Sequence, residues 1–430
     1  MSAVAGSAFE PLRHPGYRRI WLGALCLNLG LWMQVVTAGW LMVSLGGTPL
    51  EVGLIQTASA LPAFLFAVPG GVVADLVERR RYLLFSQGAL LGVALLTTAL
   101  AATGWIGPTW LLVLTFAYGL GYAVQGPAWF TAQQDVLPPA SRLAALSLGA
   151  VSYSSARAIG PALAGGLMLF GSPALVFGCV GVMALLSLAL LARSSALPTH
   201  RAPGATAEGF VAATAATLRY ARHDAPARQQ LLRTLMFIMP AAALWALLPL
   251  VAQGGGVSGG GISGGGPSAA GRYGLLLGCM GLGSVLGGLS LTAVHRRVGS
   301  RAIEIVGTLL FLTATAVCAV STPPSSLPTG LLLPLCVAGG AGWAWVGTLG
   351  VTALQMQAPP HLRARALGLY LIAFQGAMAL GGALWGQLAG SAGLHMALVI
   401  AAAGLVVSVV FSGRLPWPVN GPGTVNTRPP

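Results

Sequence analysis

Residues 131–148 read TAQQDVLPPASRLAALSL, and residues 352–369 read TALQMQAPPHLRARALGL. The two stretches align without a gap at a constant offset of 221, and nine of the eighteen positions are identical. The same offset pairs Gly160 with Gly381 and Gly165 with Gly386. Repetition at one long, fixed offset indicates that a structural unit has been duplicated. We therefore expect a chain built from two similar halves.

The composition indicates the solvent in which these halves fold. Hydrophobic residues make up 56% of the 430 residues and charged residues 7%, whereas about a quarter of a soluble domain is charged. Apolar stretches of about 20 residues are long enough to cross a bilayer as helices. Twelve such stretches lie near residues 18–43, 52–74, 82–104, 108–132, 143–169, 173–193, 231–252, 272–294, 302–321, 328–354, 364–389 and 393–412. The predicted fold class is an all-α integral membrane protein of the lipid bilayer, with twelve transmembrane helices in two pseudo-symmetric six-helix bundles.

These spans divide the chain into five segments. They are an N-terminal segment (1–17), a first six-helix bundle (18–193), a central polar loop (194–230), a second six-helix bundle (231–413) and a tail rich in Pro, Gly and Asn (414–430), which we expect to be disordered. A low-complexity Gly/Ser stretch at 254–266 falls between the seventh and eighth spans. The first span exceeds the apolar core of a signal peptide and contains Asn28 and Gln34, so we expect it to be retained.

The distribution of charge predicts the orientation in the membrane. All 22 basic residues are arginines, and with the N-terminus inside, 20 of the 22 lie on the cytoplasmic side. Arg272 then lies outside, and Arg157 lies within the fifth span. This bias follows the positive-inside rule and predicts a multi-pass protein of the inner or plasma membrane, with both termini cytoplasmic.

The same inventory argues against several other classes of protein. No basic patch on a folded face suggests a nucleic-acid partner. A Walker A phosphate loop requires a lysine, and the chain has none, so we expect no ATP-binding site. The six histidines have no metal-ligand spacing. We expect no enzymatic activity, no cofactor and no metal.

The junction of the second and third spans carries a charged motif. Gly71, Asp75, Arg79 and Arg80 are spaced as G-x3-D-x3-RR, which puts the acid about one helical turn from a guanidinium. In the second half, GGLSLTAVHRR (287–297) has Thr292 at the position of the acid. We interpret the motif as a cytoplasmic gate, in which Asp75 stabilises the positive N-terminus of a neighbouring helix in one conformation. The alternative is a solvated loop with ordinary positive-inside arginines.

The fifth span contains a full charge. Arg157 lies about 22 Å along the helix from the start of that span, near the middle of the bilayer, and Gly160, Pro161 and Gly165 follow it. A charge at that depth costs several kcal/mol unless it faces water or finds partners. We interpret Arg157 as an anchor in a central cavity for an anionic or electronegative part of a substrate. The alternative is an arginine satisfied by helix carbonyls near Pro161.

Further residues fit a cavity or a helix contact. Sites for drug-sized ligands have aromatic walls and few polar anchors. On that ground the candidates beside Arg157 are Gln34, Tyr122, Gln125, Trp245, Trp343 and Gln375. Asn28, Trp32, Trp129, Trp345 and Tyr370, also within spans, fit the same description. Small residues at four-residue spacing in the fifth, eighth and eleventh spans predict close helix packing.

Two motifs resemble those of a known family. GGVVADLVERR (70–80) resembles the signature between the second and third spans of the major facilitator superfamily, and IGPALAGG resembles the fifth-span motif of its exporters. Residues 39–81 and QGPAWFTAQQDVLPP resemble the enterobactin-exporter branch, the transmembrane secretion effectors. The resemblance implies two six-helix bundles, alternating access and efflux coupled to proton entry. Many drug exporters of this superfamily carry an acid in the first or fourth span, whereas this chain has Gln34 in the first. Asp135 or Glu51 would have to carry the proton.

The function expected from these observations is secondary active export. The substrate would be a small amphipathic compound, siderophore-like or drug-like, moved out of the cytoplasm, with protons as the coupling ion. An importer of the same fold is one alternative. A membrane receptor or scaffold without transport is another, which the absence of a long soluble domain disfavours: the central loop has only about 35 residues.

Overall fold

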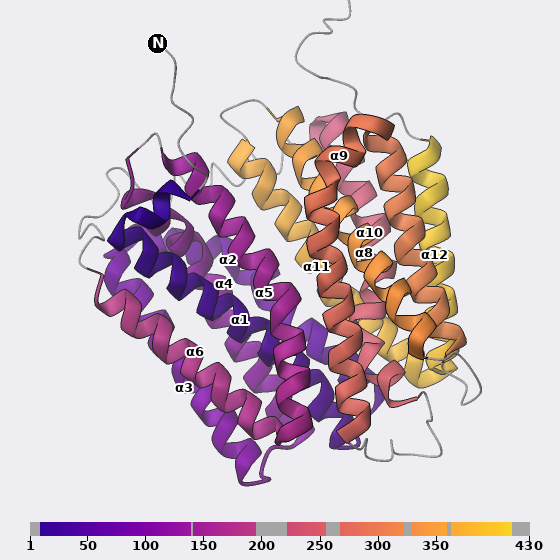
Figure 1. Ribbon diagram of the computed structural model, residues 1–430, viewed down its shortest axis with the longest axis horizontal. Helices are drawn as coiled ribbons and strands as arrows, with labels where there is room; N and C mark the ends of the chain where they lie inside the picture. Colours follow the sequence, from indigo (N-terminus) through magenta and orange to yellow (C-terminus); the bar gives the residue numbers. More distant parts are fainter. Residues whose placement is uncertain are drawn as a thin grey trace, which may run out of the picture.

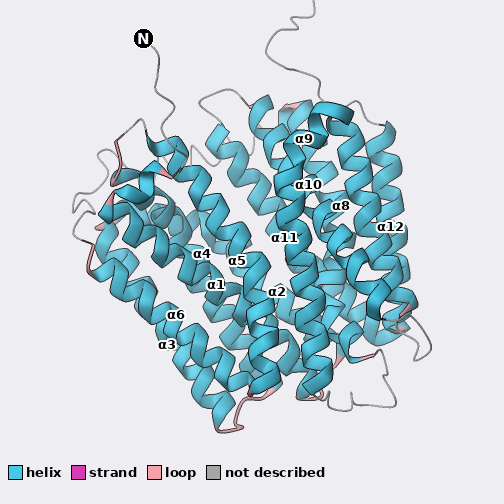
Figure 2. Cartoon of the chain, in the orientation of Figure 1, coloured by secondary structure: helices cyan, strands magenta, loops and turns pink. Residues whose placement is uncertain are grey.

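A computed structural model describes residues 9–138, 141–194, 222–254, 267–321, 329–358 and 363–414. Within these ranges the chain forms helices and no strands (Figure 2). By length and composition, ten helical segments of the described part could cross a membrane. One of them, Ala269–Val320, has 52 residues, more than twice the length of about 20 residues that one crossing needs. The prediction of an all-α membrane protein is confirmed.

The N-terminal half contains six long helices, preceded by a short 3-10 helix, η1 (Glu10–Arg13). These helices are α1 (Pro15–Ser44), α2 (Pro49–Leu76), α3 (Arg79–Ala102), α4 (Pro108–Asp135), α5 (Arg142–Phe170) and α6 (Pro173–Ala192). Proline occupies the first turn of α1, α2, α4 and α6, where its missing N–H costs nothing. The α2 start is a capping box, in which Thr48 accepts from the Glu51 N–H and the Glu51 carboxylate accepts from the Thr48 N–H.

The C-terminal half contains α8 (Ala225–Gln253), α9 (Pro267–Val320), α10 (Thr329–Gln357), α11 (Arg363–Ala392) and α12 (Leu394–Arg414). The predicted central loop ran to residue 230, but α8 begins at Ala225, because the Asp224 carboxylate accepts from the Ala227 N–H and caps the helix. The predicted break between the spans 272–294 and 302–321 was too long. In α9 only Gly299 has a non-helical backbone, with φ 76° and ψ 166°.

Several predicted segments lie wholly or largely outside the described residues. They are the chain start before residue 9, most of the central loop (195–221), the Gly/Ser stretch (255–266) and the tail (415–430).

Hydrogen bonds indicate which helix ends lie together. The Tyr17 hydroxyl donates to the Ala145 carbonyl at 3.0 Å, and Arg19 donates to the Arg193 carbonyl at 2.9 Å. The starts of α1 and α5 and the end of α6 therefore share one end of the bundle, called here the terminal end. At the opposite, distal end, Arg272 near the start of α9 donates to the Ala252 carbonyl near the end of α8 at 2.7 Å.

The two halves lie side by side, coloured indigo to magenta and red to yellow in Figure 1. They meet where α2 packs against α11 and where α5 packs against α9. Gly165 contacts Gly274, and the Thr57 hydroxyl donates to the Ala379 carbonyl at 2.6 Å. Both contacts join the distal portions of their helices. The small-residue spacing in the sequence thus corresponds to close contacts between halves at the distal end.

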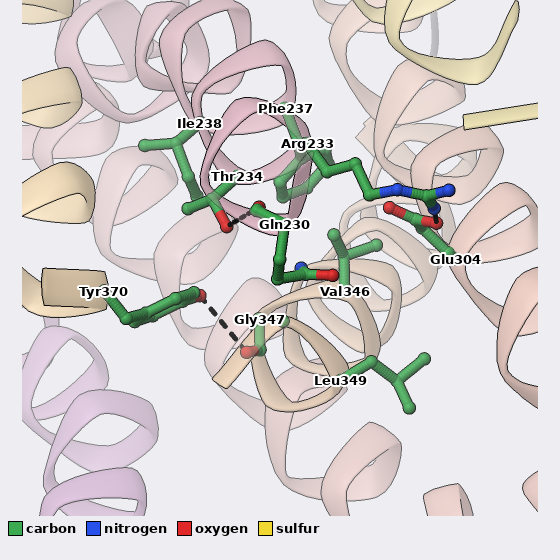
Figure 3. A pocket seen from close by; sticks show the side chains of 11 residues that line it. Gln230, Arg233, Thr234, Phe237, Ile238, Glu304, Val346, Gly347, Leu349 and Tyr370 are labelled. Atoms are coloured by element: carbon green, nitrogen blue, oxygen red, sulfur yellow. Dashed lines mark hydrogen bonds and ion pairs between the residues drawn. The ribbon is translucent and has the colours of Figure 1, made fainter. Parts of the chain in front are cut away.

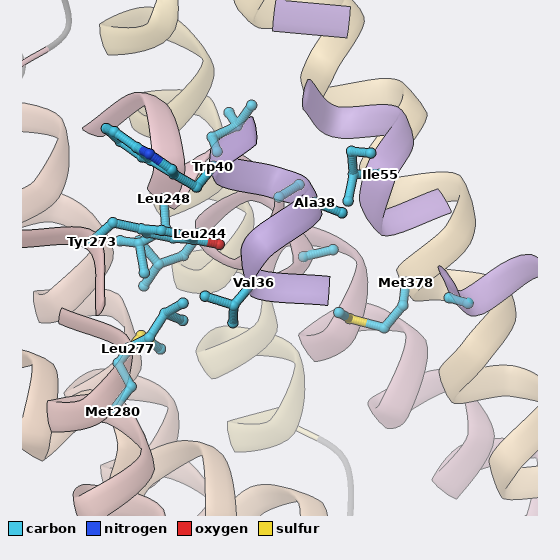
Figure 4. Packing of buried hydrophobic residues seen from close by; sticks show 14 of the residues in the cluster. Val36, Ala38, Trp40, Ile55, Leu244, Leu248, Tyr273, Leu277, Met280 and Met378 are labelled. Carbon is cyan, nitrogen blue, oxygen red and sulfur yellow. The ribbon is translucent and has the colours of Figure 1, made fainter. Parts of the chain in front are cut away.

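Aromatic and aliphatic side chains fill the space between the halves near this distal contact. Trp40 of α1 stacks on Tyr273 of α9 with ring centroids 6.2 Å apart, beside Leu244 and Leu277 (Figure 4). Large apolar side chains also lie on the outside, such as Phe85, which is 79% exposed. An all-helical exterior of this kind suits hydrocarbon, because helices satisfy their backbone hydrogen bonds internally.

Candidate functional site

A cavity of about 70 Å³ lies between the two halves, and both halves contribute to its wall. It is called here the Arg157 cavity. Its lining consists of Leu31, Trp32 and Val35 from α1, Gln56, Ser59 and Ala60 from α2, Tyr153 and Arg157 from α5, Trp245 from α8, Trp343 from α10, and Phe374, Gln375 and Met378 from α11. Of the seven residues predicted for a cavity, the structure brings together Arg157, Trp245, Trp343 and Gln375.

Three tryptophan rings surround the charge of Arg157. Its guanidinium carbon lies 5.2 Å from the Trp32 ring centroid, 4.8 Å from that of Trp245 and 4.9 Å from that of Trp343. A cation within about 6 Å of an indole is stabilised by about 2 kcal/mol or more when water is excluded. Trp32 belongs to the N-terminal half and the other two rings to the C-terminal half. Arg157 therefore joins the halves at the middle of the bundle.

The cavity retains polar atoms without a partner in the described structure. The Arg157 Nε and the indole nitrogens of Trp32 and Trp245 are buried, and none of them donates a hydrogen bond there. The ion pairs of the described residues are Arg79–Asp135, Arg81–Glu78 and Arg233–Glu304, and none includes Arg157. Buried donors of this kind are normally satisfied by water or a ligand. The site can therefore accept hydrogen-bonding, electronegative groups.

The fifth-span motif brings Trp32 to the arginine. A Cβ atom on Gly160 would lie 2.8 Å from the Trp32 Cβ, so only glycine at this position allows α1 to approach α5 so closely. The α5 helix continues from Arg142 to Phe170 through Pro161, which is buried. Gly165, further along, forms the contact with Gly274 described above. The motif thus packs α5 against α1 on one side and against α9 on the other.

Four aromatic rings contact Trp343 and together with it form what is called here the aromatic wall of the cavity. The Trp343 ring lies 5.3 Å from Trp245, 5.7 Å from Phe237, 5.5 Å from Phe311 and 5.8 Å from Phe374. The first three pairs are tilted and the Phe374 pair is edge-to-face, and aromatic pairs at such centroid distances are favourable beyond their burial. The wall therefore holds the indoles of the C-terminal half in fixed positions around the guanidinium.

The other predicted cavity residues, Gln34, Tyr122 and Gln125, are not among the side chains that line this cavity. The Tyr122 hydroxyl donates to the Asn28 side-chain oxygen at 2.6 Å, and the Asn28 amide donates to the Ser152 hydroxyl at 3.1 Å. Gln125 and Gln34 are 2% and 1% exposed. Tyr122 thus pairs with polar side chains within the N-terminal half, whereas the Gln34 amide is buried and has no hydrogen-bond partner among the described residues.

Several lining residues were not predicted, although the sequence contains a signal for some of them. Tyr153 precedes Arg157 by four residues and so shares its helix face. Gln56 and Ser59 are three residues apart in an apolar helix, a spacing that puts both on one face. Phe374 and Met378 carry no such signal, because apolar residues are equally common in the core and against lipid.

The charged motif between α2 and α3 forms contacts at the terminal end. Arg79 pairs with Asp135 at the end of α4, and Arg80 donates to the Ala192 carbonyl at 3.0 Å. Gly71 and Asp75 lie in α2, but their surroundings are outside the described side chains. Two separately predicted features, the motif arginine and the candidate proton carrier Asp135, thus meet at one place.

The second candidate proton carrier, Glu51, is at the distal end. Its carboxylate accepts from the Thr48 N–H at 2.7 Å and from the Thr48 hydroxyl at 2.9 Å, as the α2 cap. Neither Glu51 nor Asp135 lines the Arg157 cavity. Within the described residues, no three His, Cys, Asp or Glu side chains are grouped to hold a metal ion.

Comparison with solved structures shows the fold. The nucleoside transporter NupG superposes with a TM-score of 0.70 at 14% identity, over 93% of this chain and 100% of that one. A bacterial homolog of the human lysosomal transporter Spinster superposes with a TM-score of 0.70 at 17% identity, over 94% and 96%. The chain therefore has the fold of these membrane transporters.

Comparison with the sequences of known proteins identifies the family. The multidrug efflux pump Tap of Mycolicibacterium fortuitum is 27% identical over 412 residues, 92% of this chain and 95% of Tap. Tap of Mycobacterium tuberculosis is 26% identical over 399 residues, 89% of each chain. The family model for transmembrane secretion effectors matches residues 6–424. The chain belongs to the transmembrane secretion effector family, a branch of the major facilitator superfamily.

Proposed function

We propose that this protein is a secondary active exporter that moves small amphipathic compounds, drug-like or siderophore-like, out of the cytoplasm by alternating access. One observation carries the proposal: the Arg157 cavity is walled by both halves, so relative movement of the halves changes its exposure. The names of the similar proteins, multidrug efflux pumps, support export as the direction.

In this proposal the chain crosses the membrane twelve times. The N-terminal half supplies α1 to α6. In the C-terminal half, α9 is long enough for two crossings that join at Gly299, so α8 to α12 supply six more. The terminal end faces the cytoplasm, as the positive-inside rule favours. Arg18, Arg79 and Arg142 belong to that end, whereas Arg272 lies at the distal end.

With the terminal end in the cytoplasm, the distal contacts between the halves lie on the external side of the membrane. The contacts of Gly165 with Gly274 and of Gly53 with Gly382 then close the external side. The state described is inward-facing, with the outer path shut by packed helix backbones. Export requires these contacts to separate while the cytoplasmic portions of the halves come together, in the rigid-body movement typical of internally repeated transporters.

The cavity chemistry favours anionic or electronegative aromatic substrates. A substrate ring can stack on the indoles, and its negative or hydrogen-bonding group can accept from Arg157 and from the free indole N–H groups. A cation would instead meet a like charge that already occupies the space between three rings. We propose that protons are the exchanged ion; the sequence alone suggests Asp135 or Glu51 as the carrier.

The test is transport by the purified full chain in liposomes that contain a pH-sensitive dye. A catechol carboxylate, neutral chloramphenicol and cationic tetraphenylphosphonium are added in turn, and both compound uptake and proton movement are recorded. We expect the anion to move and to drive opposite proton movement. Arg157→Gln should reduce movement of the anion at least tenfold and that of chloramphenicol less, whereas Arg272→Gln, at the distal end, should resemble the unchanged protein.

Two results would contradict this proposal. An equal loss for all three compounds in Arg157→Gln would mean that the arginine is structural rather than an anchor. Absence of any compound movement in the unchanged protein, with binding intact, would favour a receptor over a transporter.

A further inference from the structure

A second, smaller cavity in the C-terminal half contains a buried ion pair. The cavity of about 10 Å³ is lined by residues of α8, α9, α10 and α11 (Figure 3). In it, Arg233 of α8 lies 2.5 Å from the Glu304 carboxylate of α9, and the two side chains are 1% and 6% exposed. By their positions in the sequence, Arg233 and Glu304 lie near the starts of the predicted spans 231–252 and 302–321, where charges are ordinarily solvated. The fold instead buries both charges.

Glu304 is exceptional among the acidic residues. Of the carboxylates whose side chains the structure describes, it alone is buried, with 5% of the residue exposed. Asp135 and Glu78 are also paired with arginines, but their side chains are 28% and 24% exposed. A buried carboxylate is strongly favoured in its charged form while an arginine pairs with it, and in its neutral, protonated form once that arginine is withdrawn. A solvated carboxylate depends much less on such a partner.

The cavity has room and polarity for a water molecule. A volume near 10 Å³ holds about one water. The Gln230 side-chain oxygen is buried there, and no described residue donates a hydrogen bond to it. A water at this position would contact the same cavity wall as Glu304. The site therefore offers a carboxylate and room for one water molecule beside it.

One layer of aromatic side chains separates this site from the Arg157 cavity. Phe237 and Tyr370 line the small cavity, whereas Trp343 and Phe374 line the Arg157 cavity. Phe237 and Trp343 lie 5.7 Å apart between ring centroids, and Tyr370 stacks on Phe374 at 6.2 Å. A substrate that displaces these rings also moves the wall of the ion-pair cavity.

Resting on the proposed exporter function, we propose that Glu304 binds the exchanged proton and that Arg233 is the positioning residue that expels it. In the other conformation the pair separates, and the carboxylate takes up one proton from external water. On return to the present conformation Arg233 pairs with the carboxylate, and the proton leaves to cytoplasmic water. Each cycle carries one proton inward on Glu304 against one movement of substrate outward.

The groups around Glu304 are consistent with this role. On its own helix Arg301 is the nearby charge, α8 contributes Arg233, and α12 contributes a hydrogen bond from Ser412. On α11, the Tyr370 hydroxyl lines the cavity and donates to the Gly347 carbonyl at 3.2 Å. The α10 lining is apolar or backbone. No second carboxylate of the described residues competes for the proton in this cavity.

The experiment measures proton movement and compound exchange in the same liposomes, with the panel compound that the unchanged protein moves fastest. Exchange of labelled for unlabelled compound needs no net proton transfer, so it reports substrate handling alone. We expect Glu304→Gln to reduce compound-driven proton movement at least tenfold and to keep exchange within about twofold. Glu78→Gln, which also removes an arginine-paired carboxylate at the terminal end, should change neither quantity.

Arg233→Met combined with Glu304→Met guards against simple misfolding, because apolar replacement of a whole buried pair generally preserves the fold. If the pair is only structural, this double variant keeps proton movement as well as exchange, and the proposal is overturned. Proton movement that persists in Glu304→Gln, or that is lost instead in Asp135→Asn or Glu51→Gln, overturns it too. Exchange without proton movement in the unchanged protein rejects Glu304 as a proton carrier, whereas absence of exchange rejects the exporter itself.

Discussion

Replacing Gly382 by alanine adds a methyl group where α11 packs against α2 at the distal end. The added Cβ would lie 2.6 Å from the Gly53 carbonyl oxygen, 2.7 Å from the Thr57 hydroxyl and 2.9 Å from the Thr57 nitrogen. Carbon–oxygen contacts are comfortable only from about 3.3 Å. The two backbones must therefore move apart by about 0.7 Å in this conformation.

Overpacking of this kind costs about 1–3 kcal/mol. The cost falls on the conformation in which α2 and α11 touch and is relieved when their distal ends separate. The equilibrium should therefore shift by roughly 5- to 150-fold toward the conformation in which the distal ends of α2 and α11 are apart. Gly390→Ala is the matched control, because a Cβ there meets nothing within 4 Å. It shares with Gly382→Ala the gain in helix propensity that alanine brings.

The assay is a distance distribution between spin labels at Thr103 and Met396, exposed distal positions in the two halves. The five native cysteines, all free among the described residues, are replaced first. We expect the fraction of molecules with a longer distance between the labels to increase in Gly382→Ala and not in Gly390→Ala. Identical distributions in the two variants would refute the reasoning that this backbone contact selects the conformation.

Three further outcomes follow from the contacts described above. Trp343→Ala removes the centre of the aromatic wall and should lower the free energy of unfolding in detergent by about 3–5 kcal/mol. Trp105→Ala, at a site that is 80% exposed, should change that free energy little. Arg79→Gln and Asp135→Asn each break the same partly exposed ion pair. A double-mutant cycle should give a coupling energy of up to about 1 kcal/mol between them, and zero coupling would reject the pair. Thr48→Ala should cost about 1 kcal/mol through loss of the α2 cap, with Thr48→Ser retaining most of it in the same unfolding measurement.

Much of the architecture could be predicted because its signals are local. The apolar stretches became helices with ends within a few residues of those expected, and the duplicated segment corresponds to the α4–α5 and α10–α11 connections. The errors occurred where polarity does not mark a break. HRRVGSR (295–301) has the composition of a loop, yet the helix there departs from helical geometry only at Gly299. The polar stretch before residue 231 was likewise expected to be loop, but Asp224 caps a helix that begins at Ala225.

The candidate site was predictable in part. Arg157 stands out because a charge within an apolar span requires partners, and large aromatic residues are its natural neighbours. The sequence does not indicate which tryptophans come within reach, since Trp32, Trp245 and Trp343 belong to three helices and two halves. The Arg233–Glu304 pair was missed for the same reason. Its residues are 71 positions apart, and each alone looks like a charge at a helix end.

The continuity of α9 has a mechanical consequence. Its first arm contains Gly274, which touches α5 across the boundary between the halves, and its second arm begins just before Glu304. One residue joins the arms, and its backbone, at φ 76° and ψ 166°, is accessible essentially to glycine alone. The two arms of α9 can therefore change their relative angle only at Gly299. A tilt of the first arm at the distal end would turn the second arm about Gly299 and so shift the buried Glu304 carboxylate, because no loop lies between the arms to absorb the motion.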